Sequence, residues 1–350
     1  MKQIKPQNEN LLYNGRIDWD DPEAPVFAQP ASFVSFRMVG KRIDVTVENH
    51  KGYWDCYLGL LLDGEMTTKV RLPEKDRATV TVIDNLPEGE HSICLFKCCD
   101  QSNIFTLYEI LVDDEAVVLP SDPLPERRME VYGDSVSAGE VSEAVEYTGK
   151  PDPQHNGEYS NSYYSFTWMT ARKLNARIHA VAQGGVALLD NTGWYCGPDF
   201  VGMETLYNKI ECNPQINMMK DWDFANYTPH VVLVCIGQND ANPVNFMADD
   251  YEGDLAKNWR AHYRAFIERL RELYPNATIV LTTTILNHDK NWDEAIEQVC
   301  QELGDKKVHH FLFSNNGCGT PGHIRRPEAD VMSDELSAFI AGLGNDIWND

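Results

Sequence analysis

Residues 129–139 read MEVYGDSVSAG. A short apolar run leads into Gly-Asp-Ser at 133–135 and then into small residues, which is typical of a buried strand that enters a tight turn and opens a helix. Such a turn raises the hydroxyl of Ser135 at the carboxyl edge of a sheet, beside backbone N–H groups that can stabilise an oxyanion. Because Gly-Asp-Ser also forms ordinary turns and helix N-caps, its meaning depends on the rest of the chain.

Strand-like and helical runs alternate through the remaining two thirds of the chain. The strand-like runs are 129–132, 177–182, 230–236, 277–284 and 307–313, and the helical runs are 162–174, 255–274, 293–303 and about 327–343. This alternation predicts βαβ units and a mostly parallel sheet. Ligands bind such sheets outside the carboxyl ends of the strands, so the residues that follow each strand are the candidates for a site.

Reactive groups follow several of these strands. Ser135 follows the first, the pair Gly184 and Gly185 the second, and Asn239 the third, while His323 ends the glycine-rich loop after the last. A nucleophile, a glycine N–H, an amide donor and a base therefore meet at one edge of one sheet. These groups suit attack on an ester carbonyl, with N–H groups stabilising the oxyanion.

Two further residues follow strands of the predicted sheet and need an interpretation. His288, after the fourth strand, is a rival for the base, and Asp240 is expected to brace its own loop rather than to react.

The first third of the chain has a different pattern. Short alternating runs are broken by turn residues, and they read 33–39, 42–48, 57–63, 78–84, 91–97 and 104–112. This spacing predicts an antiparallel β-sandwich, and Asp63-Gly64 predicts a tight hairpin turn. Residues 119–128, LPSDPLPERR, are interpreted as a linker, so we expect domains at 1–122 and 123–350.

Composition narrows the classes of function. The formal charge of −24 argues against nucleic-acid and anionic-membrane partners. No run of about 18 apolar residues predicts a membrane span, and the N-terminus lacks the apolar core of a secretory signal. Nine cysteines without a CxxC pair favour reduced, buried thiols in a cytoplasmic protein and no metal site.

The order Gly-Asp-Ser, Gly, Gly-x-Asn-Asp and a late histidine resembles the SGNH (GDSL-type) hydrolases. With a leading β-sandwich, the whole chain resembles carbohydrate esterase family 2, whose members remove O-acetyl groups from sugars of plant polysaccharides such as xylan and mannan. The resemblance implies an α/β fold class, with a jelly-roll-like antiparallel sandwich followed by a three-layer α/β/α SGNH domain whose sheet is mostly parallel.

The resemblance also implies roles for single residues. Ser135 matches the nucleophile and, through its N–H, one oxyanion donor. Gly185 matches the second donor, with Gly184 as the alternative one residue away. Asn239 matches the third donor and His323 the general base.

One position departs from the family pattern. SGNH enzymes usually carry an aspartate three residues before the histidine, and Thr320 stands there. Three interpretations stay open: a backbone carbonyl of residues 317–322 orients the ring, a carboxylate such as Glu328 or Asp330 reaches back, or activity is reduced. We favour the carbonyl, since some family 2 esterases are understood to work as Ser–His dyads. Ile324 also replaces a commonly seen proline.

Aromatic residues are candidates for stacking on a sugar. Trp194 is the strongest because it follows the Gly184-Gly185 loop, and packing is the alternative for each of the others, which are Trp19, Tyr53, Trp54, Tyr57, Trp222 and Trp292. The polar loop 141–161, with Asp152, His155 and Asn156, either lines the acceptor side of the cleft or is a plain surface loop.

The sequence thus predicts a cytoplasmic carbohydrate O-acetyl esterase that acts on manno- or xylo-oligosaccharides through Ser135 and His323, without metal or organic cofactor. Two alternatives remain. One is an SGNH esterase of another acyl substrate, and the other is a sugar-binding protein with a weakened active site, for which Thr320 is the argument.

Overall fold

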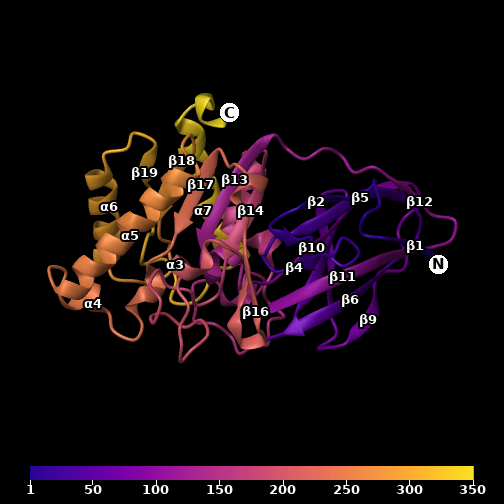
Figure 1. The fold of residues 1–350 in the computed structure, drawn as a ribbon, viewed down its shortest axis with the longest axis horizontal. Helices are drawn as coiled ribbons and strands as arrows, with labels where there is room; N and C mark the ends of the chain where they lie inside the picture. Colours follow the sequence, from indigo (N-terminus) through magenta and orange to yellow (C-terminus); the bar gives the residue numbers. More distant parts are fainter. Residues whose placement is uncertain (350) are drawn as a thin grey trace.

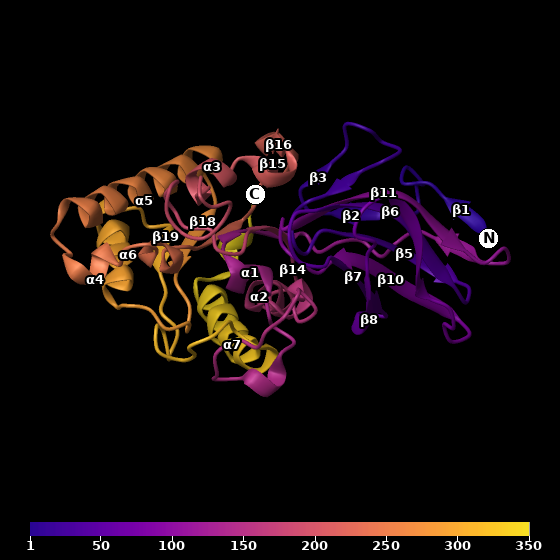
Figure 2. The same cartoon turned by 90° about the horizontal axis from the view of Figure 1, so that it is seen from below.

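The computed structural model describes residues 1–349, which form two lobes lying side by side (Figure 1). The N-terminal lobe consists of antiparallel strands, and the C-terminal lobe consists of parallel strands with helices on both faces (Figures 1 and 2). None of the helices within this described range is both long and apolar enough to cross a bilayer.

The N-terminal lobe is a sandwich of two six-stranded antiparallel sheets. One sheet has the order β3-β4-β11-β6-β9 with β1 beside β11, and the other has the order β12-β5-β10-β7-β8 with β2 beside β5. The strands are β1 (Lys2–Ile4), β2 (Leu12–Asn14), β3 (Ile17–Asp18), β4 (Val26–Phe27), β5 (Phe33–Val39), β6 (Ile43–Lys51), β7 (Tyr57–Leu62), β8 (Glu65–Arg71), β9 (Arg77–Ile83), β10 (Glu90–Lys97), β11 (Asn103–Val112) and β12 (Val117–Leu119).

Alternating side chains fill the space between the two sheets. Ile43, Val45 and Val47 of β6 are fully buried there, as the two-residue period of a strand requires. Asp63 and Gly64 form the turn between β7 and β8, with φ of 52° and 84°, the left-handed values of a tight hairpin. The predicted sandwich and hairpin are confirmed.

The C-terminal lobe is built on a parallel sheet of five strands in the order β14-β13-β17-β18-β19. Its strands are β13 (Arg127–Gly133), β14 (Ala176–Ala182), β17 (Val231–Cys235), β18 (Thr278–Thr282) and β19 (Val308–His310). The helices are α1 (Ser135–Ala138), α2 (Phe166–Lys173), α3 (Met203–Leu206), α4 (Phe246–Asp249), α5 (Asp254–Leu273), α6 (Asn291–Leu303) and α7 (Arg326–Gly342).

Helices cover both faces of this sheet, as predicted for a three-layer α/β/α domain. Helices α2 and α7 pack on one face and α5 and α6 on the other (Figure 2). Alternating side chains of the central strands divide between the two cores: Val232 and Val234 face α5, whereas Leu233 faces α2 and α7.

Two parts of this lobe differ from the sequence-based expectation. The helix expected over 162–174 is a 3-10 turn at Ser162–Tyr164 followed by α2, because the Ser165 side chain accepts from Trp168 N and starts a new helix there. A hairpin of β15 (Lys209–Asn213) and β16 (Met218–Asp221) was not expected at all.

The two lobes share polar contacts as well as packing. Arg16 of the sandwich is fully buried and pairs with Glu130 of β13 at 2.9 Å. Asp55 N donates to Asn156 O at 2.9 Å, and the rings of Trp54 and His155 lie 4.6 Å apart. The sandwich therefore supports the long loop that follows α1.

Candidate functional site

A cavity of about 410 Å³ opens at the carboxyl edge of the parallel sheet. The five residues predicted to form the site, namely Ser135, Gly185, Asn239, His323 and Trp194, all line this cavity. The remaining lining residues are Tyr53 and Trp54 of the sandwich together with Glu140, Gly184 and Leu286. The structure therefore brings together groups that lie up to 270 residues apart along the chain, from Tyr53 to His323.

The turn that carries Ser135 depends on small residues. Strand β13 ends at Gly133, where an added Cβ would lie 2.2 Å from Ser137 Oγ. The Asp134 carboxylate caps the short helix α1 by accepting from Val136 N at 3.2 Å. Ser135 is the first residue of α1, so its N–H has no acceptor within the helix and is available at the cavity.

Asp134 is fully buried beneath this turn. Burial raises its pKa to about 6, although a hydrogen bond from Gln238 Nε2 at 2.8 Å favours the charged form. The carboxyl group is thus part of the support of Ser135 and not a free acid at the cavity wall.

Asp152 orients the imidazole of His323. Its Oδ2 lies 2.5 Å from His323 Nδ1, and its Oδ1 accepts from His323 N at 2.9 Å. Arg325, which is fully buried, forms an ion pair with the same Oδ1, with its Nη2 2.7 Å away. The favoured expectation of a backbone carbonyl is therefore wrong, because a carboxylate from the 141–161 loop occupies that position.

The carboxylates that were expected to reach back have other partners. Glu328 accepts from Arg325 N and Gly149 N, at 2.7 and 2.9 Å, and Asp330 pairs with Lys173 at 3.0 Å. Thr320 is fully buried, its backbone bonds to residues 285 and 287, and its hydroxyl has no hydrogen-bond partner among residues 1–349, so Thr320 does not hold the imidazole.

Negative charge surrounds His323. Burial disfavours the charged imidazole, but Glu140 and Asp152 outweigh this effect and raise the pKa of His323 to about 9. Burial alone would raise the pKa of Asp152, yet the His323 hydrogen bonds and the Arg325 charge hold it well below its usual range. The imidazole and its partner thus form an ion pair at neutral pH.

The two glycines of the donor loop differ in their hydrogen bonding. Gly184 N donates to Asp100 Oδ2 at 2.8 Å, whereas the N–H of Gly185 meets no acceptor within residues 1–349. Gly185 has a φ of 75°, and an added Cβ would lie 2.8 Å from Trp194 Cβ. This geometry favours Gly185 over Gly184 as the free donor.

The Asn239 amide lies at the cavity with both hydrogens engaged. Its Nδ2 donates to Asp134 Oδ2 at 3.2 Å and to Val186 O at 3.1 Å. The contact with Asp134 is the dispensable one, because Gln238 also donates to that oxygen. Turning one N–H toward an oxyanion would therefore leave no buried carboxylate oxygen unpaired.

The aromatic candidates separate into two groups. Trp194 has 64% of its surface exposed beside the cavity, and Tyr53 and Trp54 line it from the sandwich. Trp292 is fully buried, and Trp222 packs against His179 and Arg16. The other two candidates, Trp19 and Tyr57, do not line the cavity; they contact Tyr13 and Lys69.

The remaining expectations concern His288 and Asp240. His288 contacts Leu286 O at 2.6 Å through Nδ1 and Asp293 Oδ2 at 3.1 Å through Nε2, away from the cavity lining. Asp240 accepts from Leu188 N at 2.8 Å and from Leu189 N at 3.3 Å, so its role is structural as expected, but it braces the loop after β14 and not its own loop.

Sequence reasoning missed Arg325 and Glu140, and it named Asp152 without its role as the partner of His323. The loop of Asp152 was expected either to line the acceptor side of the cleft or to be a plain surface loop, and Arg325 directly precedes α7 without a motif. Glu140 follows the recognised GDSVSAG stretch by one residue. The position of Glu140 directly after the Ser135 turn could have marked it as a site residue. The sequence offers no such signal for Asp152 or Arg325.

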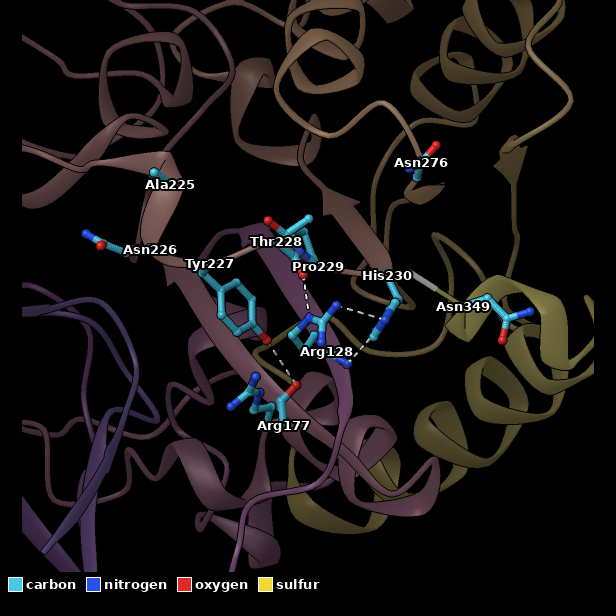
Figure 3. Close-up of a pocket in the computed structure, with 10 residues that line it drawn as sticks. All are labelled: Arg128, Arg177, Ala225, Asn226, Tyr227, Thr228, Pro229, His230, Asn276 and Asn349. Carbon is cyan, nitrogen blue, oxygen red and sulfur yellow. Dashed lines mark hydrogen bonds between the residues drawn. The ribbon is translucent and has the colours of Figure 1, made fainter.

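A second cavity of about 390 Å³ lies at the opposite edge of the sheet, where β13, β14 and β17 begin (Figure 3). Arg128 and His230 point toward each other in it, with Arg128 Nη2 3.0 Å from His230 Nε2, and Tyr227 lies next to Arg177. Its described lining contains no serine, cysteine or carboxylate, so it has a histidine but no counterpart of Ser135 or of Asp152.

Known proteins resemble this chain in sequence and in fold. Residues 13–121 match the model of the family described as carbohydrate esterase 2 N-terminal. The chain is 27% identical over 347 residues to the cellulase/esterase CelE of Acetivibrio thermocellus, with 95% of this chain aligned. It spans only 39% of the length of that relative. It is 25% identical over 338 residues to an acetylxylan esterase/glucomannan deacetylase of Cellvibrio japonicus, covering 95% of this chain and 89% of that protein.

The same likeness appears among solved structures. A family two carbohydrate esterase from Clostridium thermocellum, solved in complex with cellohexaose, superposes with a TM-score of 0.79 at 23% identity. The superposition covers 95% of this chain and 98% of the other. The family match over residues 13–121, the two relatives aligned over 95% of this chain and the shared two-lobe fold all support a place for this chain in carbohydrate esterase family 2.

Proposed function

We propose that the protein is a serine-dependent carbohydrate O-acetyl esterase that deacetylates plant-derived manno- or xylo-oligosaccharides. The observation that carries this proposal is the joint placement of Ser135, Gly185, Asn239 and His323 on one cavity, with Asp152 on the far nitrogen of the imidazole. The names of its relatives, an acetylxylan esterase/glucomannan deacetylase among them, support the substrate class.

Each group has a defined task in the proposed reaction. His323 Nε2 takes the Ser135 proton as Oγ attacks the acetyl carbonyl, and Asp152 stabilises the imidazolium that forms. The N–H groups of Ser135 and Gly185, together with the Asn239 amide, stabilise the oxyanion. His323 then gives its proton to the departing sugar oxygen, and water releases acetate from Ser135.

The wall of the cavity supports a short acyl group and a sugar. Leu286 is the one aliphatic side chain among its described lining residues, so a long acyl chain would find few aliphatic side chains to pack against. The exposed indole of Trp194 offers a face on which a sugar ring can stack. No metal or organic cofactor enters the proposed reaction, and the cytoplasmic location stays a prediction.

The test is acetate release from acetylated manno- and xylo-oligosaccharides. We expect release by the wild type, loss in Ser135→Ala, and retention in Ser314→Ala, an exposed serine outside the cavity lining. Faster hydrolysis of long-chain than of acetyl 4-nitrophenyl esters would favour another acyl substrate. Oligosaccharide binding without hydrolysis of any ester would favour the sugar-binding alternative.

A further inference from the structure

Glu140 is a carboxylate in the cavity that lacks a hydrogen-bond donor. Gly139, with a φ of 80°, ends α1 and turns the chain, so that the next side chain points toward the cavity. Only 9% of the Glu140 side chain is exposed, yet no donor within residues 1–349 lies at hydrogen-bond distance from its carboxyl oxygens. A buried carboxyl group without a donor is costly, and such groups usually have a ligand or an ordered water.

The surroundings of Glu140 direct it toward the reacting groups. Gly184 makes room for it, because a Cβ there would lie 2.5 Å from Glu140 Oε2 and 2.7 Å from Asp100 Oδ2. Asp100 is satisfied by Gln183 Nε2 and Gly184 N, both at 2.8 Å, so it does not compete for a ligand.

Glu140 also faces the catalytic nitrogen of His323. Its Oε1 lies 3.7 Å from Nε2, which is too long for a direct hydrogen bond. One oxygen atom at about 2.8 Å from each would bridge the two groups. The oxygen that reacts at Nε2 therefore lies within reach of Glu140 as well.

We propose that Glu140 holds the attacking water of deacylation against His323 and so favours hydrolysis over transfer of the acyl group to an alcohol. Water has two hydrogens, one for His323 Nε2 and one for Glu140 Oε1. An alcohol has one hydroxyl hydrogen and leaves one of the two acceptors unsatisfied. This inference rests on the proposed acyl-enzyme at Ser135.

The proposed step is balanced within the site. The water oxygen forms a bond to the acyl carbon while His323 takes one water proton. The bond from that carbon to Ser135 Oγ then breaks, and His323 returns the proton to Oγ. The second proton leaves with the carboxylic acid and passes to solvent.

The charge state of Glu140 suits this task at the pH where His323 is a base. Burial raises the pKa of Glu140 to about 7, while the nearby His323 charge opposes the shift. Above neutral pH the group is therefore a carboxylate and a strong acceptor.

The experiment measures how the acyl-enzyme divides between two acceptors. The protein reacts with 4-nitrophenyl acetate in the presence of methanol, and methyl acetate and free acetate are quantified. We expect the ratio of methyl acetate to acetate to rise about tenfold in Glu140→Leu, because a charge-assisted hydrogen bond to water is lost. Glu140→Gln, which keeps a neutral acceptor, should fall between Glu140→Leu and the wild type.

Glu146→Gln is the matched control, since Glu146 is exposed and lies outside the cavity lining. The product ratio does not depend on the amount of folded enzyme, so a loss of stability in one variant cannot produce the expected change. An unchanged ratio in Glu140→Leu, with 4-nitrophenol release that still requires Ser135, overturns this proposal alone. Wild-type protein that releases no 4-nitrophenol overturns the proposed function and this inference with it.

Discussion

Asp152 provides the carboxylate next to His323 that Thr320, in the position of the usual aspartate, does not have. A carboxylate on Nδ1 fixes the imidazole and leaves Nε2 for the cavity, and in the proposed reaction it stabilises the charged ring. Arg325 in turn holds Asp152 in place at 2.7 Å. The loss of an aspartate three residues before the histidine is therefore compensated from a loop 171 residues earlier in the chain.

Asp152→Asn should lower kcat/KM for 4-nitrophenyl acetate by about 100-fold or more, since an amide neither fixes the tautomer nor stabilises the imidazolium. Asp330→Asn, which removes a surface carboxylate paired with Lys173, is the control. Equal activities of the two variants would show that Asp152 does not orient the base.

The pH profile should report the raised pKa of His323. The charged groups near the ring are Glu140, Asp134, Asp152 and Arg325, and the pKa of His155 is lowered by burial, so this second imidazole adds no positive charge near neutral pH. Only the neutral imidazole accepts the Ser135 proton, so kcat/KM should increase with pH up to about pH 9. A profile that is already flat at pH 7 would contradict this charge arrangement.

Removing the Glu140 charge should also move this profile. Glu140 is the first of the neighbours that raise the pKa of His323, so Glu140→Gln lowers that pKa and shifts the rising limb to lower pH. The check is the midpoint of kcat/KM against pH, measured beside Glu146→Gln.

At the scale of elements, the regular parts of the chain were predictable and the loops were not. Buried parallel strands such as β17 appear as short apolar runs, and the groups that follow them converge because their carboxyl ends share an edge. Strand β8 was missed because it is a polar edge strand held by pairing with β7. The role of Asp152 was missed because its loop follows no period, and its partner is fixed only by tertiary packing.

The loop after β14 depends on glycine at position 185. Gly185→Ala should destabilise the protein by about 1–2 kcal/mol through its left-handed backbone alone, and contact with Trp194 adds to this. We expect a lower Tm and a lower kcat, because the N–H of residue 185 would shift.

Gly149→Ala is the matched control for this change. Gly149 has a φ of 68°, and an added Cβ meets no atom within 4 Å. The difference between the two variants isolates the contact with Trp194. Equal losses of Tm, with unchanged kcat in both, would argue against a role for Gly185.

At the scale of the whole molecule, the two lobes are joined by a buried ion pair. Arg16 and Glu130 are both fully buried, and Arg16 also donates to Tyr207 O at 2.7 Å. Glu130 lies on β13, the strand that ends at the Ser135 turn. The sandwich therefore contacts the strand that leads into the Ser135 turn.

Arg16→Met should lower the free energy of unfolding by about 3–5 kcal/mol, since it leaves Glu130 as an uncompensated buried charge. Adding Glu130→Gln should recover part of this loss. Urea unfolding measures both. Arg37→Met, which breaks the exposed pair with Glu90, should cost under about 1 kcal/mol. Similar costs for Arg16→Met and Arg37→Met would refute the buried pair as a source of stability.

The contact of Asp55 with Asn156 limits how the two lobes could be exchanged between proteins in evolution. The segment that provides the partner of the imidazole is held by the sandwich through this hydrogen bond and through Trp54 against His155. The sandwich therefore could not be replaced by an unrelated domain without loss of these contacts. A recombination event that moved residues 123–350 onto another carrier would transfer the nucleophile and the base but would leave behind the support that aligns them.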